Sequence, residues 1–204
     1  MWGSYRRLYA YPMIEDPAAE VRADKDGTSW RVGSQAEVEW INGQTEVGMT
    51  ITSGIPPVFG AYATIVVPED VGERQLRDRA ILAILVDHTA DQRWWLGYLD
   101  DGTSDTIFVD APQVGISPGA RYVLVEAGPI QAATWRTESS WRGALPELMF
   151  PADHSWLLNT LIDDDWSCFG GPSHLVKRLV ADAMLETLTV GLVEDATPPG
   201  HTAI

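Results

Sequence analysis

Residues 93–102 read RWWLGYLDDG, a run in which large apolar side chains fill almost every position before an acidic turn. Successive side chains of a β-strand point to opposite faces of its sheet. One face would carry Trp94, Leu96 and Tyr98, and the other Trp95 and Leu99. Because both faces carry large apolar groups, the pattern predicts a central strand that is covered on both sides.

Short β-like runs precede this strand. Residues 62–67 are rich in β-branched and aromatic side chains and end at Pro68, which predicts a strand that stops there. Further upstream, apolar residues alternate between Trp30 and Ile51 around Asn42-Gly43. That alternation around a turn dipeptide predicts a β-hairpin.

More strands are predicted downstream. Residues 100–104 have turn chemistry, residues 106–109 return from the turn, and residues 121–126 form a third strand of the meander. Residues 155–168 are predicted to form a pair of strands, and residues 188–193 a closing strand.

The first clear helix is predicted over residues 71–88. Asp70 and Glu73 resemble a capping box at its start. Glu73 with Arg77, and Arg74 with Asp78, form i,i+4 charge pairs that are expected on the polar side. The expected core face consists of Leu76, Ala80, Ile81, Ile84 and Leu85.

A second clear helix is predicted over residues 173–186. Ser173 follows Gly170-Gly171-Pro172 and is expected to be its N-cap. The expected core face consists of Leu175, Val176, Leu179, Val180 and Met184. A further short helix is expected over residues 129–136.

Strands outnumber helices and do not alternate with them, so the predicted fold class is α+β: a mainly antiparallel sheet packed with two main helices. We predict a single domain over residues 29–196, because both helices need the same sheet to bury their apolar faces. Residues 1–28 are predicted to be a loop or a partly disordered segment. Residues 197–204 are predicted to be a C-terminal tail.

Composition excludes several function classes. The 204 residues carry a net charge of −15, from 14 Lys plus Arg against 29 Asp plus Glu, and this charge disfavours nucleic acid as a ligand. The longest apolar run, residues 80–86, is far shorter than the ~18 residues that cross a bilayer, so no membrane span is expected. Cys168 is the only cysteine, which favours a cytoplasmic location.

Residue types that carry chemistry are present but not in recognised arrangements. Asp163-Asp164-Asp165 lacks the spaced ligands of an EF-hand, and the four histidines lack the spacing of HExxH. Cys168 lies between Trp166 and Phe169 and is expected to be a buried thiol. We therefore predict no catalytic residue, no metal site and no cofactor.

Four segments resemble a family of uncharacterised acidic proteins from high-GC bacteria. They are WWLGYLDDG (94–102), ELMFPADHSW (147–156), SWLLNTLIDDDWSCFGGP (155–172) and EDATPPGH (194–201). The resemblance implies no activity and no site residue. It implies an origin in a bacterial cytoplasm.

The strong charge and the nine tryptophans predict a macromolecule-binding protein, most specifically an immunity-type or antitoxin-like inhibitor that masks a basic protein partner. The predicted partner-binding residues are Trp94, Trp95, Tyr98, Asp100, Asp101, Asp105, Asp163, Asp164 and Asp165. One alternative is a hydrolase of unfamiliar type that uses Asp or Cys168. Another is a small-ligand or sugar-binding module that stacks its ligand on Trp94, Trp95 and Tyr98. The oligomeric state is not predicted.

Overall fold

A computed structural model of the chain describes residues 20–24, 26–89, 91–100, 107–108, 110–117, 120–136, 143–161 and 165–202. Within these ranges, ten strands form one sheet in which every pairing is antiparallel. They are β1 (Val21–Ala23), β2 (Ser29–Val32), β3 (Ala61–Val66), β4 (Trp94–Leu99), β5 (Gln113–Ser117), β6 (Ala120–Ala127), β7 (Leu148–Pro151), β8 (Leu157–Thr160), β9 (Trp166–Gly171) and β10 (Thr187–Val190).

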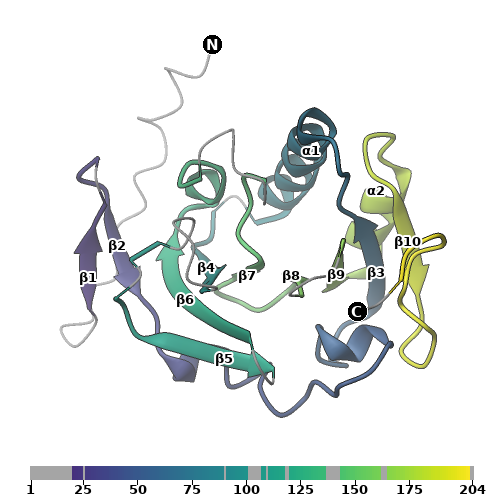
Figure 1. Cartoon of the computed structure of the whole chain (residues 1–204), viewed down its shortest axis with the longest axis horizontal. Helices are drawn as coiled ribbons and strands as arrows, with labels where there is room; N and C mark the ends of the chain where they lie inside the picture. Colours follow the sequence, from purple (N-terminus) through teal and green to yellow (C-terminus); the bar gives the residue numbers. More distant parts are fainter. Residues whose placement is uncertain are drawn as a thin grey trace.

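The sheet has the order β1-β2-β6-β4-β7-β8-β9-β3-β10, and β5 pairs with β6 off this path. It curves strongly across the molecule (Figure 1). Strand β4 lies between β6 and β7, as the sequence predicts. One apolar cluster contains Trp94, Leu96 and Tyr98, and a separate cluster contains Trp95 and Leu99. The prediction of a central strand covered on both faces is confirmed.

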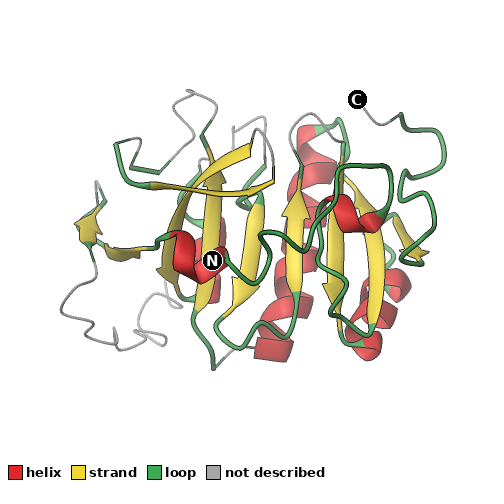
Figure 2. Ribbon diagram, turned by 90° about the horizontal axis from the view of Figure 1, so that it is seen from below, coloured by secondary structure: helices red, strands yellow, loops and turns green. Residues whose placement is uncertain are grey.

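Helices α1 (Val71–Thr89) and α2 (Ser173–Ala181) lie on the same side of the sheet (Figure 1). The other face is covered by the irregular segment that contains the 3-10 helices η2 (Gln35–Val38) and η3 (Ile51–Ser53), drawn in front of the strands in Figure 2. A third 3-10 helix, η4 (Pro129–Ala133), follows β6. The fold is therefore α+β and consists mostly of sheet.

The predicted hairpin between Trp30 and Ile51 is wrong. Strand β2 ends at Val32, and a side chain on the next residue, Gly33, would bring a Cβ within 2.7 Å of Leu124 Cδ2. Ser34 then starts η2 through a capping box with Glu37. Val38 and Ile51, which suggested strands, anchor this segment on the second face instead, together with Ile41.

Several predicted boundaries also change. Helix α2 ends at Ala181, because Asp182 adopts an extended backbone and its carboxylate accepts a hydrogen bond from Met184 N. Its N-cap is Pro172, and the Ser173 hydroxyl donates to Gly60 O. Strand β10 ends at Val190, three residues before the predicted end.

Three loop predictions are corrected as well. Ile107 and Phe108 form a turn rather than a returning strand, while residues 106 and 109 lie outside the described residues. Residues 21–23, predicted as loop, form β1. In the predicted tail, Pro198 is buried and the His201 ring pairs with Asp165.

The C-terminal end of α1 is joined to the sheet through one hydroxyl group. The buried Thr89 Oγ1 accepts hydrogen bonds from the indole nitrogens of Trp94, at 3.1 Å, and Trp156, at 3.2 Å. The same hydroxyl donates to Leu85 O at 3.1 Å. Because the two indole rings meet edge to face at 4.8 Å between centroids, Thr89 satisfies two buried donors at once. None of the helices that the structure describes has the length and apolar character of a membrane span.

Candidate functional site

The three aromatic residues predicted to bind a partner are core residues. Trp94 and Tyr98 are 0% exposed and Trp95 is 5% exposed. The outer face of the Trp95 ring is covered by the Arg31 guanidinium, 4.5 Å from its centroid. Burial therefore leaves Trp94, Trp95 and Tyr98 without the exposed ring surface that direct contact with a partner needs.

Two of the acidic residues predicted to bind a partner, Asp100 and Asp165, are partly or fully exposed. The Asp100 carboxylate is half-buried and accepts a hydrogen bond from the side chain of Gln113. The Asp165 side chain is exposed and pairs with His201 Nδ1 at 2.6 Å. Asp101, Asp105, Asp163 and Asp164 lie outside the described residues.

Two concave surfaces lie on opposite sides of the first half of α1. Side chains three or four positions apart lie on the same side of a helix. Glu73, Leu76 and Arg77 therefore share one side of α1, and Arg74, Asp78 and Leu82 share the other. The first surface, here called the acidic groove, is lined by Glu73, Leu76, Arg77, Met184, Leu185 and Glu186. The second, here called the arginine pocket, is lined by Arg74, Asp78, Arg79, Leu82, Ala133 and Arg136.

The acidic groove encloses about 420 Å³ between α1 and the segment that joins α2 to β10. Its apolar walls include Leu76, which is 45% exposed, and Met184, which is 51% exposed. Glu73 and Glu186 are exposed and bring two carboxylates to the same groove. Leu76, Val180 and Met184 were predicted to face the core, and this is wrong because all three are exposed; Leu76 and Met184 line the groove.

Arg77 forms the buried floor of the acidic groove. Its Nε donates to Val66 O at 3.0 Å, and its terminal nitrogens reach the Ser167 hydroxyl and Asp78 Oδ1, the latter at 3.0 Å. Burial lowers the pKa of the guanidinium, and the Asp78 carboxylate opposes that shift. The predicted placement of Arg77 and Asp78 on the polar side of the helix is therefore wrong, since both side chains are buried.

An open sheet edge continues from the groove. Strand β10 begins one residue after Glu186 and pairs with β3, and no other described strand pairs with it. Leu188 on this strand is 38% exposed. Exposed apolar side chains, carboxylates and unpaired strand edge therefore lie in one continuous region.

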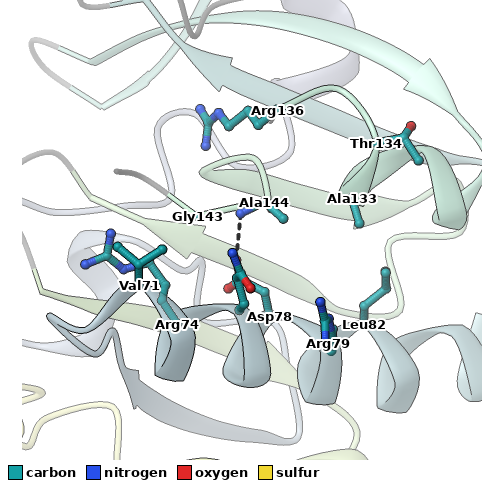
Figure 3. Close-up of a pocket in the computed structure, with 11 residues that line it drawn as sticks. Val71, Arg74, Asp78, Arg79, Leu82, Ala133, Thr134, Arg136, Gly143 and Ala144 are labelled. Carbon is teal, nitrogen blue, oxygen red and sulfur yellow. Dashed lines mark hydrogen bonds between the residues drawn. The ribbon is translucent and has the colours of Figure 1, made fainter. Parts of the chain in front are cut away.

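The arginine pocket lies between α1 and the chain that leads to β7 (Figure 3). Asp78 Oδ2 accepts a hydrogen bond from Ala144 N at 2.8 Å, which fastens the far wall to the helix. Arg136, above it, is held by both carboxylate oxygens of Glu147 at 2.7 Å. Neither concave surface could be predicted from a local sequence motif, because each brings residues of α1 together with residues more than 50 positions away.

Other reactive side chains lie away from both surfaces. Cys168 is 2% exposed and packs beside Gly54, which agrees with the predicted buried thiol. The His88 and His174 rings meet at 5.1 Å, and His154 stacks on Trp40 at 4.4 Å. Among the described residues, no three His, Cys, Asp or Glu side chains gather in a way that would hold a metal ion.

Comparison of the chain with protein-family models, with curated proteins and with solved structures finds no match.

Proposed function

We propose that this protein binds a basic protein and masks it, as an immunity-type or antitoxin-like inhibitor of a bacterial cytoplasm does. The observation that carries the proposal is the acidic groove, where the exposed side chains of Leu76 and Met184 lie between the carboxylates of Glu73 and Glu186. The anchors of binding are therefore aliphatic residues of the groove and not the buried tryptophans.

A lysine or arginine of the partner fits this combination of groups. Long basic side chains bury an aliphatic stem on apolar surface while the charged end stays near water or a counter-ion. In the groove, the stem would pack on Leu76 and Met184 and the cation would pair with Glu73 or Glu186. The positive charge of Arg77 below is offset by Asp78 at 3.0 Å, so the local field stays negative.

The net charge and the open edge extend this contact. A charge of −15 attracts a basic surface over distances of about a Debye length, which speeds association and weakens with salt. An extended segment of the partner would pair with the free side of β10, next to Glu186. Backbone pairing would then add affinity to the contacts made by the groove.

The two alternative functions receive less support. Stacking of a sugar on Trp94, Trp95 and Tyr98 requires exposed rings, and these rings are buried. A hydrolase that uses Cys168 requires access to a thiol that is 2% exposed.

The test is a double charge reversal, Glu73→Lys with Glu186→Lys. The immobilised wild-type protein should capture a basic protein from a lysate of its source organism, and the captured amount should fall as salt is raised. The groove variant should lose this protein, because two lysines would repel the incoming cation.

The matched control is Glu39→Lys with Glu46→Lys. Both side chains are exposed and flank the segment on the other face of the sheet. This variant has the same change in net charge and should still capture the partner. Equal loss in both variants, or a captured protein that is acidic, would contradict the proposal.

A further inference from the structure

The arginine pocket gathers three arginines on a strongly acidic protein. Three guanidinium groups, from Arg74, Arg79 and Arg136, line it together with a single carboxylate, that of Asp78. The chain as a whole has 29 acidic residues against 14 Lys plus Arg. Among the lining residues arginines therefore outnumber carboxylates, whereas acidic residues predominate in the chain, and an anion would find its best-suited cations here.

Most of these charges are already committed to structure. Arg136 is bound by Glu147, and Asp78 is bound by Arg77 and by the backbone N–H of Ala144. Arg74 is held against the start of α1, where its nitrogens donate to Pro68 O at 2.9 Å and Glu69 O at 3.0 Å.

Arg79 differs from these residues. Its side chain is exposed, and no hydrogen bond or ion pair joins it to another described residue. In Figure 3 it lies on the pocket side of α1, next to Leu82. An arginine that no described residue binds keeps its fork of N–H donors for a ligand, and a carboxylate accepts two of them at once.

The remaining walls of the pocket are apolar. Val71 and Leu82 from α1 face Ala133 and Ala144 across the cavity (Figure 3). Its volume is about 280 Å³, near the lower end of pockets that take small molecules. A ligand that fills it therefore needs a compact apolar body as well as an anionic group.

Two close contacts hold the described part of the far wall near α1. Gly143 has φ of +86°, a conformation that suits glycine, and a Cβ there would come within 2.6 Å of Asp78 Oδ2. Arg136 Nη1 donates to Leu145 O at 2.7 Å. Contacts that hold pocket residues in place lower the entropy cost of binding a small ligand.

We propose that the arginine pocket binds a small carboxylic acid with a compact apolar body, and that Arg79 recognises the carboxylate while Leu82 and Ala133 contact the body. This proposal does not depend on a basic partner, because the arginine pocket and the acidic groove lie on opposite sides of α1.

The test uses benzoate and hexanoate as probes of the purified wild-type protein, with binding followed by thermal shift and by NMR titration. Both acids should raise Tm and perturb signals of Leu82 and Ala133. Benzamide, which keeps the body, and acetate, which keeps the charge, should each bind at least about tenfold more weakly. Phenyl phosphate distinguishes a carboxylate site from a general anion site. If phenyl phosphate binds more tightly than benzoate, the assignment to carboxylates is overturned.

Two variants locate the binding site. Arg79→Gln should weaken benzoate binding at least about tenfold, because one charge-assisted pair is lost. Ala133→Phe should abolish binding by filling the cavity while Arg79 is still present. The matched control is Lys177→Gln, which removes one exposed positive charge on α2 and should leave the affinity within about twofold.

Three results would overturn the proposal. If neither acid binds with a Kd below about 10 mM, the pocket is not a carboxylate site. Equal affinity of wild type and Arg79→Gln would remove Arg79 from recognition. Equal weakening by Lys177→Gln would assign the effect to overall charge.

Discussion

Arg77 and Asp78 are neighbours in the sequence of α1, and their buried side chains form an ion pair at 3.0 Å that separates the acidic groove from the arginine pocket. Arg77 lines the groove and Asp78 lines the pocket. Each side chain also makes a hydrogen bond to another part of the fold. Arg77 donates to the carbonyl oxygen of Val66 in β3, and Asp78 accepts from the backbone N–H of Ala144 in the far wall.

Asp78→Asn should therefore destabilise the protein strongly. The substitution leaves the Arg77 guanidinium buried without its counter-charge, and loss of one partner of a buried pair costs about 3 kcal/mol or more. Urea denaturation of the two proteins would measure the difference. Asp87→Asn is the matched control, because the Asp87 pair with Arg178 is exposed and should contribute less than about 1 kcal/mol. Equal effects of the two substitutions would contradict this account.

Thr89→Val should cost about 2 kcal/mol or more in the free energy of unfolding. The methyl group fits the space of the hydroxyl, but the buried indole N–H groups of Trp94 and Trp156 lose their acceptor. Thr89→Ser keeps that acceptor and should be much closer to wild type. Guanidinium titrations followed by tryptophan fluorescence would report both stabilities. A valine variant as stable as the serine variant would show that the shared hydroxyl has no energetic role.

Leu179→Asp should unfold the protein, whereas Val180→Asp should be tolerated. Leu179 is 0% exposed and packs in the cluster under α2, while its neighbour Val180 is 44% exposed. A carboxylate forced into that cluster lacks a counter-charge and costs several kcal/mol. Circular dichroism melting of the two variants would check this prediction. A folded Leu179→Asp protein with unchanged Tm would show that the buried face of α2 is assigned incorrectly.

Stability should fall as pH is lowered from 7 to 5, in part through His88. Burial and the neighbouring His174 ring lower the pKa of His88 below its usual 6.5. As pH falls, His88 therefore takes up a proton in the unfolded state before it does so in the folded state. The contribution of neutral His88 to the free energy of unfolding is complete above its unfolded pKa and is lost as pH falls through its folded pKa. Melting temperatures of wild type and His88→Gln across this range would test it. The variant should show the shallower decline, and an equally steep decline would exclude His88 as a contributor.

Much of the sheet could be predicted because a strand that is buried on both faces needs large apolar side chains at nearly every position. Trp94 to Leu99 shows this most clearly, and the apolar residues of 155–168 likewise indicate a pair of strands. Between Trp30 and Ile51, where apolar residues alternate instead, the pattern was misleading, because spaced apolar residues also anchor an irregular chain on a sheet face. Local pattern does not distinguish these two uses.

The candidate sites were harder to predict from sequence. Leu76 and Met184 look like core residues in a helical pattern, and only the approach of α1 to the segment before β10 shows that they line a groove. Arg79 and Ala133 become neighbours in the same way, across more than 50 residues of chain. Tryptophan content predicted an exposed anchor, but Trp30, Trp94 and Trp156 are fully buried, and composition alone does not separate core rings from exposed ones.

The shared hydroxyl of Thr89 also limits how α1 can move. With two bonds accepted and one donated, its capacity is used, so turning or sliding the last turn of the helix would break both hydrogen bonds from the indoles together. That end acts as a fixed pivot. Val71 lies roughly 27 Å away along the axis, given the rise of an α-helix, so any tilt is largest near the first turns. The α1 residues that line the acidic groove and the arginine pocket lie toward that end, so a tilt of α1 would change the width of both concave surfaces.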